Sequence, residues 1–182
     1  MLKTLIAALA LFALPATAQT GADVLGPDAA ACQPGAGKTA VLVTVDGFKS
    51  RDGTVRVELW PGVDGDFLRD HHALVAEGKV YHRVVVPVPA SGPAKVCVPL
   101  PRPGTYALGA FHSPEGVRKF NVRKDGATFT RNPRVGLSKP KAADVAVVYT
   151  DGLNTEIVTL NYLRGLAFRP IPKQELETAE KR

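Results

Sequence analysis

The hexapeptide TVRVEL, residues 54–59, alternates strictly between polar and apolar side chains. Successive side chains of a strand point to opposite sides, so Val55, Val57 and Leu59 share one face and the polar residues share the other. This pattern predicts a half-buried β-strand. Residues 40–45 have a similar character, and the sequence DGFKSRDG between the two runs is rich in turn-forming residues. We therefore expect a hairpin connection there.

Further apolar and β-branched runs predict strands along the rest of the chain. They cover residues 80–88, 95–100, 105–111, 143–150 and 155–163, with two short strands at 120–123 and 127–130 on either side of a turn at 124–126. A helix of any length inside the domain is expected only at 66–77. About seven short strands with Pro and Gly turns and almost no helix are typical of an antiparallel β-sandwich.

Residues 1–18 have the features of a secretory signal peptide. A single cation, Lys3, precedes an apolar run at 5–14, and the small triplet Ala16-Thr17-Ala18 follows it. The apolar run is about half as long as the roughly 20 residues that a membrane-spanning helix needs. We expect cleavage before Gln19, a periplasmic or secreted protein, and no membrane span after cleavage.

The remaining chain divides by composition into three parts. Residues 19–38 are rich in Gly, Ala and Pro without a periodic apolar face, which predicts a flexible N-terminal arm. Residues 39–168 form the expected β-sandwich domain, and residues 169–182 form a charged C-terminal tail. The formal charge of the 182-residue chain is +6, which favours weak attraction to anionic surfaces.

The sequence contains two cysteines, Cys32 and Cys97. In an oxidising compartment we expect them to form a disulfide, with two separate thiols as the alternative. If Val96 and Val98 point into the core, Cys97 points out of it. The bond would then tie the arm across the outer face of a sheet, where it could cover an edge strand.

The segment GAGKTA, residues 35–40, superficially resembles a phosphate-binding loop. Such a loop needs a Gly where this chain has Cys32, and it lies between a strand and a helix. Here a strand pattern follows the segment instead. We expect no nucleotide ligand, and no nucleic acid, because only Phe120 and Phe129 accompany the basic residues described below.

Four histidines, His71, His72, His82 and His112, lack the spacing of a metal site, so we expect no metal and no cofactor. The serines lie outside any nucleophile elbow, and no catalytic residue is assigned. Two alternatives remain open. One is an envelope hydrolase of carbohydrate or peptide that uses His112 with a loop carboxylate. The other is a carrier of a small ligand or metal between the sheets.

A basic region covers residues 115–141, where eight cations accompany two acids. Sandwich loops often carry function on a rigid scaffold, so this region with His112 is the candidate surface for an anionic envelope component or another envelope protein. A merely solvated face is the alternative. The candidate residues are His112, Arg118, Lys119, Arg123, Lys124, Arg131 and Arg134.

Three stretches together resemble a bacterial family, domain of unknown function 2141. They are VTVDGFKSRDGTVRVELW (43–60), LPRPGTYALGAFHSPEG (100–116) and NPRVGLSKPKAADVAVVY (132–149). The resemblance spans roughly residues 39–163. It implies an exported immunoglobulin-like or transthyretin-like β-sandwich, without an established activity.

The family carries a run His-Asp-x-Asn-Gly-Asn-Gly-Lys-x-Asp, whose closely spaced oxygen side chains resemble calcium-binding loops. The corresponding run here, HSPEGVRKFN at 112–121, keeps His112, Gly116 and Lys119 but has only one carboxylate, Glu115. The sequence therefore predicts no calcium site and makes His112 a structural partner of a turn or a remnant. Altogether it predicts a non-enzymatic binding or structural accessory protein of the cell envelope.

Overall fold

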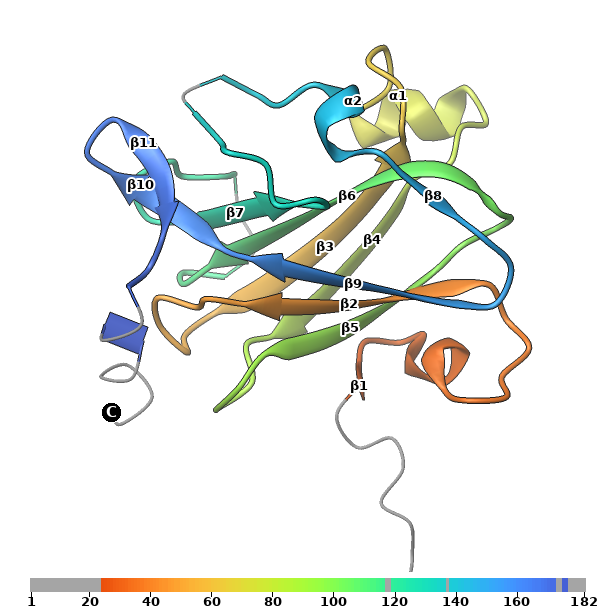
Figure 1. Ribbon diagram of the computed structural model, residues 1–182, viewed down its shortest axis with the longest axis horizontal. Helices are drawn as coiled ribbons and strands as arrows, with labels where there is room; N and C mark the ends of the chain where they lie inside the picture. The colour runs from red at the N-terminus through yellow and green to blue at the C-terminus, as the bar shows by residue number, and fades with distance from the viewer. Residues whose placement is uncertain (1–23, 117–118, 137, 173–174, 177–182) are drawn as a thin grey trace, which may run out of the picture.

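The computed structural model describes residues 24–116, 119–136, 138–172 and 175–176, which form two packed β-sheets (Figure 1). The predicted all-β sandwich is confirmed. The predicted signal peptide lies outside the described residues. Among those residues, no helix is both long and apolar enough to cross a membrane.

Eleven strands occur in the described ranges. They are β1 (Val24–Leu25), β2 (Ala40–Asp46), β3 (Thr54–Pro61), β4 (His82–Pro87), β5 (Ala94–Pro99), β6 (Gly104–Ser113), β7 (Gly126–Phe129), β8 (Val147–Tyr149), β9 (Leu153–Thr159), β10 (Asn161–Arg164) and β11 (Ala167–Pro170). The helices are η1 (Ala29–Cys32, a 3-10 helix), α1 (His71–Ala76) and α2 (Ala142–Val145).

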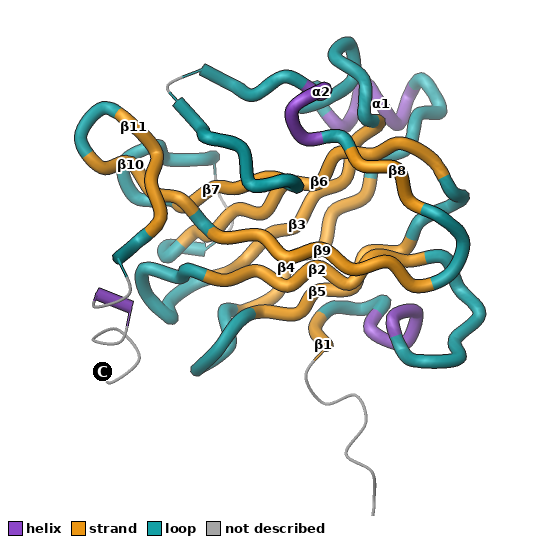
Figure 2. Tube along the Cα trace, viewed as in Figure 1, coloured by secondary structure: helices purple, strands orange, loops and turns teal. Residues whose placement is uncertain are grey.

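The strands divide into a four-stranded sheet, ordered β1-β5-β2-β9, and a seven-stranded sheet, ordered β11-β10-β7-β6-β3-β4 with β8 beside β6. The pairs β2 with β9 and β1 with β5 are parallel. The sandwich is therefore mixed rather than antiparallel throughout. Figure 2 shows the chain passing from β9 into β10, where it leaves the smaller sheet and joins the larger one.

The predicted hairpin between residues 40–45 and 54–59 is wrong. β2 pairs with β5 and β9, whereas β3 pairs with β4 and β6 in the other sheet. The apolar faces of the two strands meet across the core, so the connection crosses between layers. At its end Gly53 has φ +75°, and a Cβ there would lie only 2.0 Å from the carbonyl oxygen of Ser113. Only glycine fits this crossing.

Two other predicted strands also differ. Residues 120–123 form no strand: residues 122–124 lie in a turn, and the Asp125 carboxylate accepts the Asn121 N–H at 2.8 Å. β7 consequently pairs with β6 rather than with these residues. The predicted strand 143–150 begins as α2, where the Asp64 carboxylate accepts the Ala142 N–H at 2.8 Å, and only its end forms β8.

The predicted helix at 66–77 is shorter than expected. α1 begins after Asp70, whose carboxylate caps it by accepting the N–H groups of His72 and Ala73. Such an N-cap satisfies amides that have no partner within the helix. Leu68, just before the cap, has φ +57° and is not helical.

The main core lies between the sheets and is built from the alternating residues of β2 and β3, among others. A second cluster on the outer face of the larger sheet contains Trp60, Phe111 and Phe129 beneath Leu74 of α1 and Val145 of α2. β6 is therefore covered on both faces, which explains why it is buried almost throughout.

The disulfide between Cys32 and Cys97 is present, with the two Cα atoms 5.8 Å apart. As predicted, it lies on the outer face of the four-stranded sheet, where it packs with Ala40. β1 pairs with the edge of β5, so the beginning of the described chain covers that edge. The disulfide thereby holds this segment against the sheet.

We expect the double substitution C32S/C97S to lower the free energy of unfolding by about 2–4 kcal/mol. The bond closes a loop with a sequence separation of 65 residues, and loss of such a cross-link increases the entropy of the unfolded chain. Urea unfolding of the oxidised protein, the reduced protein and the variant measures the effect. The reduced protein and the variant should agree; equal stability of all three would contradict the assignment.

Candidate functional site

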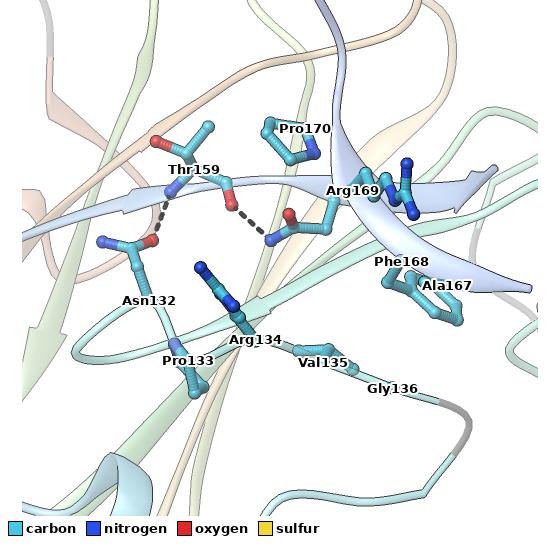
Figure 3. Close-up of a pocket in the computed structure, with 11 residues that line it drawn as sticks. Asn132, Pro133, Arg134, Val135, Gly136, Thr159, Ala167, Phe168, Arg169 and Pro170 are labelled. Atoms are coloured by element: carbon cyan, nitrogen blue, oxygen red, sulfur yellow. Dashed lines mark hydrogen bonds between the residues drawn. The ribbon is translucent and has the colours of Figure 1, made fainter.

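A cleft of about 850 Å³ lies between residues 132–136 and the β10–β11 hairpin (Figure 3). Residues 132–136 line one side, residues 167–170 line the other, and Thr159 and Asn161 complete the lining. The cleft therefore lies where the chain crosses from β9 to β10. Its volume is in the range of small-molecule binding sites.

The wall at 132–136 is fixed by the Asn132 side chain. Arg131 and Asn132 have φ of +65° and +45°, and this left-handed turn directs the chain away from the end of β7. The Asn132 Oδ1 atom accepts the Thr159 N–H at 2.8 Å, and its Nδ2 donates to the Ile157 carbonyl at 3.0 Å. The side-chain amide thus pairs with the edge of β9 as a neighbouring strand would.

Asn161 completes this arrangement. Its Nδ2 donates to the carbonyl of Thr159 at 3.1 Å, so side-chain amides bind both backbone polar groups of Thr159 (Figure 3). At the crossing itself, the buried Leu160 donates its N–H to the Asp46 carbonyl at 2.8 Å. The strand crossing is therefore bonded on several sides, and the cleft has a preformed floor.

The opposite wall is held by an aromatic contact and an ion pair. The Phe168 ring of β11 stacks on Phe120, with centroids 6.4 Å apart. At the end of β10, the Arg164 guanidinium donates to the Glu175 carboxylate at 3.0 Å. Both contacts attach the β10–β11 hairpin to neighbouring segments.

Two arginines border the cleft. Arg134 extends from the first wall into it, and Arg169 belongs to the second (Figure 3). Both are exposed, and neither has an ion-pair partner within the described ranges. Unpaired cations in a concave surface concentrate positive potential and attract anions.

Arg134 also borders a second hollow, of about 540 Å³. Arg131, Lys139 and Lys141 line this hollow as well, and Asp144 is its only acidic lining residue within the described chain. The Asp144 carboxylate accepts the Lys141 backbone N–H at 3.3 Å. The positive surface therefore continues from the cleft past Arg134.

His112 does not belong to the exposed basic surface on which the sequence placed it, because its side chain is fully buried. Its Nε2 lies 2.9 Å from the Asp52 carbonyl and its Nδ1 2.6 Å from the Tyr162 hydroxyl. A carbonyl only accepts, so Nε2 carries the proton and Nδ1 accepts from Tyr162. The Tyr162 oxygen in turn accepts the Lys49 N–H at 3.0 Å.

This chain of bonds ties the β2–β3 connection to β6 and β10. Burial lowers the pKa of His112, an effect partly offset by its bond to Asp52 and by the nearby Asp125 carboxylate. The ring is therefore neutral near pH 7, and both of its nitrogen atoms are bonded to the protein.

The other predicted basic residues separate into two groups. Arg131 and Arg134 line the hollows, whereas Lys119, Arg123 and Lys124 lie exposed in the turn before β7. Lys124 there pairs with Glu115. Arg118 lies outside the described residues.

Sequence reasoning missed Arg169, which it assigned to the tail. The signal for the β10–β11 hairpin was Gly165 between the runs NYLR and AFRP. In the structure Gly165 has φ +67°, as expected for a tight hairpin turn.

A separate polar cluster lies on the outer face of the larger sheet. The buried Glu58 carboxylate accepts hydrogen bonds from the Tyr81 hydroxyl at 2.8 Å and from Arg83 at 2.6 Å. Desolvation by burial and the bond to Glu58 raise the pKa of Tyr81. These partners compensate the buried charge. In the part of the chain that the structure describes, no group of three or more His, Cys, Asp or Glu could hold a metal ion.

The family model described as "Uncharacterized protein conserved in bacteria (DUF2141)" matches residues 43–157, more than half of the chain. The chain belongs to this family. The range that the DUF2141 model matches includes residues 132–136 and ends before the β10–β11 hairpin, so it contains one wall of the cleft. No curated protein and no solved structure matches the chain.

We expect Tyr162→Phe to lower the free energy of unfolding by about 1–3 kcal/mol. The change leaves the His112 Nδ1 and the Lys49 N–H without a partner, and unpaired buried groups cost about this much. Tyr106→Phe is the matched control, because in the described part of the chain its hydroxyl bonds only the carbonyl of the exposed Arg102. Thermal and urea unfolding should separate the two variants, and equal losses would argue against the proposed bonding of His112.

The stability should also depend on pH through His112. Since its pKa is lower in the folded state than the ordinary 6.5, the unfolded chain binds more protons as the pH falls below 6.5. The contribution of this histidine is therefore complete above pH 6.5 and decreases below it. NMR titration should find the His112 ring protonating below pH 6.5; protonation above that value in the folded protein would contradict this account.

Proposed function

We propose that this protein is an exported, non-enzymatic binding module of the cell envelope that holds an anionic ligand in the cleft between residues 132–136 and β11. The observation that supports this most directly is the pair Arg134 and Arg169. Both arginines border a cleft of about 850 Å³, and neither is neutralised by an acidic side chain in the described chain. If this surface had only a structural role, two unpaired cations beside a hollow would add little to the stability of the fold.

The chemistry of the lining suits a carboxylate-bearing ligand. A guanidinium group binds carboxylates through two parallel hydrogen bonds. The apolar side chains of Pro133, Val135 and Phe168 line the same cleft. The cleft therefore fits a ligand that carries negative groups together with less polar parts.

Export is supported by two features of the chain. Residues 1–18 read as a signal peptide, and the disulfide requires an oxidising compartment to persist. We infer a mature chain that begins at Gln19 and acts in the periplasm or outside the cell.

The hydrolase alternative has less support. It needs His112 in a cleft beside a carboxylate, but this ring is buried and bonded to Asp52 and Tyr162. The carrier alternative needs a lined space between the sheets, where the side chains of the main core pack instead. The binding module is therefore the function that the geometry favours.

The proposal is tested with the mature chain and two fluorescent anions, a hexamer of galacturonic acid and a hexaglutamate peptide. At 20 mM salt at least one of them should bind, and the affinity should fall at 150 mM salt because screening weakens exposed charge pairs. R134Q and R169Q should each weaken binding about tenfold, the effect of losing roughly 1.4 kcal/mol.

The matched control is R102Q, which removes an exposed arginine outside the cleft. It should retain the affinity of the unmodified protein. If neither anion binds even at 20 mM salt, or if R102Q weakens binding as much as R134Q, the proposed function is wrong.

A further inference from the structure

We propose that the ligand of the cleft is an extended acidic peptide segment, which adds a strand to the free edge of β11. This inference rests on the proposed function of the same cleft and names its class of ligand. It depends on the backbone groups that the two walls present, in addition to the charges of Arg134 and Arg169.

β11 is the outermost strand of the seven-stranded sheet, so within the described residues only its β10 side is paired. The two strands are joined by Gly165 and Leu166, and Arg164 lies opposite Ala167. The closing pair of a two-residue hairpin exchanges both of its backbone hydrogen bonds, and the next pair along the ladder does not. The next pair is Leu163 with Phe168. The N–H and C=O of Phe168 therefore face the free edge.

The pairing of β10 on its other side agrees with this assignment. Asn161 pairs with Ala127 of β7. The Thr130 N–H donates to the Leu108 carbonyl of β6, and backbone groups alternate in direction along a strand, so Ala127 directs its groups toward β10 and Asn161 directs its own toward β7. Leu163 is two residues further along, and its backbone groups therefore point to the same side as those of Asn161. Since Leu163 directs its groups toward β7, its neighbour Phe168 must direct its own groups away from β10.

The other wall presents free backbone as well. Within the described chain, Arg134, Val135 and Gly136 make no hydrogen bond with any other residue. Figure 3 shows this segment running past the hairpin with the cleft between them. A strand that entered the cleft would thus find donors and acceptors on both sides. A peptide has matching groups at every residue, whereas a polysaccharide has no regular succession of amides and carbonyls.

Pro170 limits how far such a strand could pair. Two residues after Phe168, Pro170 is the next residue whose backbone faces the free edge, and it has no N–H to donate. Proline on an edge strand also hinders uncontrolled pairing with other chains. Backbone pairing is therefore confined to a short stretch around Phe168, and side-chain contacts must supply much of the affinity.

Arg134 and Arg169 determine which peptides bind. Arg169 directly follows Phe168, the residue that offers the free edge, and Arg134 extends into the cleft from the other wall. Acidic side chains on the bound segment would pair with both. Charge-assisted hydrogen bonds of this kind are stronger than neutral ones. The combination selects an acidic segment in extended conformation.

The test uses the mature protein and a fluorescent peptide, acetyl-EVEVEV-amide. Two derivatives carry N-methyl groups, one on the glutamates and one on the valines, and a third replaces each glutamate by glutamine. We expect the glutamine peptide and at least one N-methylated peptide to bind at least tenfold more weakly. If both N-methylated peptides bind as well as the parent, the backbone is not used and the inference is wrong.

Hydrogen exchange of single amides gives a second readout. Binding of the parent peptide should slow exchange at Phe168 at least tenfold. The Arg169 amide already bonds to β10 and serves as the internal control. No added protection at Phe168 in the peptide complex would overturn the inference.

The hexamer of galacturonic acid separates this inference from the proposed function. If it binds in a manner sensitive to R134Q while the peptide does not bind, the cleft is an anion site but not a peptide site. If the hexamer, the hexaglutamate peptide and the parent peptide all fail to bind at 20 mM salt, both proposals are wrong. R102Q is again the matched control, and it should leave peptide binding unchanged.

Discussion

The structure depends on the burial of two apolar strand faces against each other. Val43 and Val45 of β2 meet the core from one sheet, and Val55, Val57 and Leu59 of β3 meet it from the other, each at most 1% exposed. Burying a side chain of this kind contributes about 1.5–3 kcal/mol. Because consecutive strands bury their faces against each other, they must lie in different sheets. Every later strand adds to one of the two sheets to which β2 and β3 belong.

The same constraint creates the cleft. A chain that contributes to both sheets must cross between them, and the last crossing in the described residues lies at Leu160, between β9 and β10. At a crossing the backbone leaves one hydrogen-bond ladder before it enters the next, so its polar groups need other partners. Asn132 and Asn161 supply them at Thr159. Their side chains keep residues 132–136 beside the hairpin, and the space between is the cleft.

The polar residues of the chain serve two different purposes. His112 and Glu58 are buried, and their partners satisfy them within the protein. Arg134 and Arg169 are exposed at a concave surface without acidic partners in the described ranges. The cost of burying a polar group explains the first pair as parts of the fold. Only the second pair is available to another molecule, and the proposed function is assigned to it for that reason.

Local pattern was sufficient for the sandwich and for the faces of its main strands, because alternation reports directly which side chains leave water. It also placed Cys97 on the outer face. The basic composition of residues 115–141 included Arg131 and Arg134, which line the hollows, but their role as a binding surface stays a prediction. Alternation does not report which strand lies beside which, so the hairpin expected between β2 and β3 was wrong. Likewise, His112 was wrongly assigned to the surface. Its buried bonds join it to Asp52 and Tyr162, which lie 60 and 50 positions away in the sequence, so the local pattern does not report them. Arg169 reaches the cleft only through the pairing of β10 with β7 and β11. Such contacts depend on the packing of the whole chain, which no local stretch of sequence encodes.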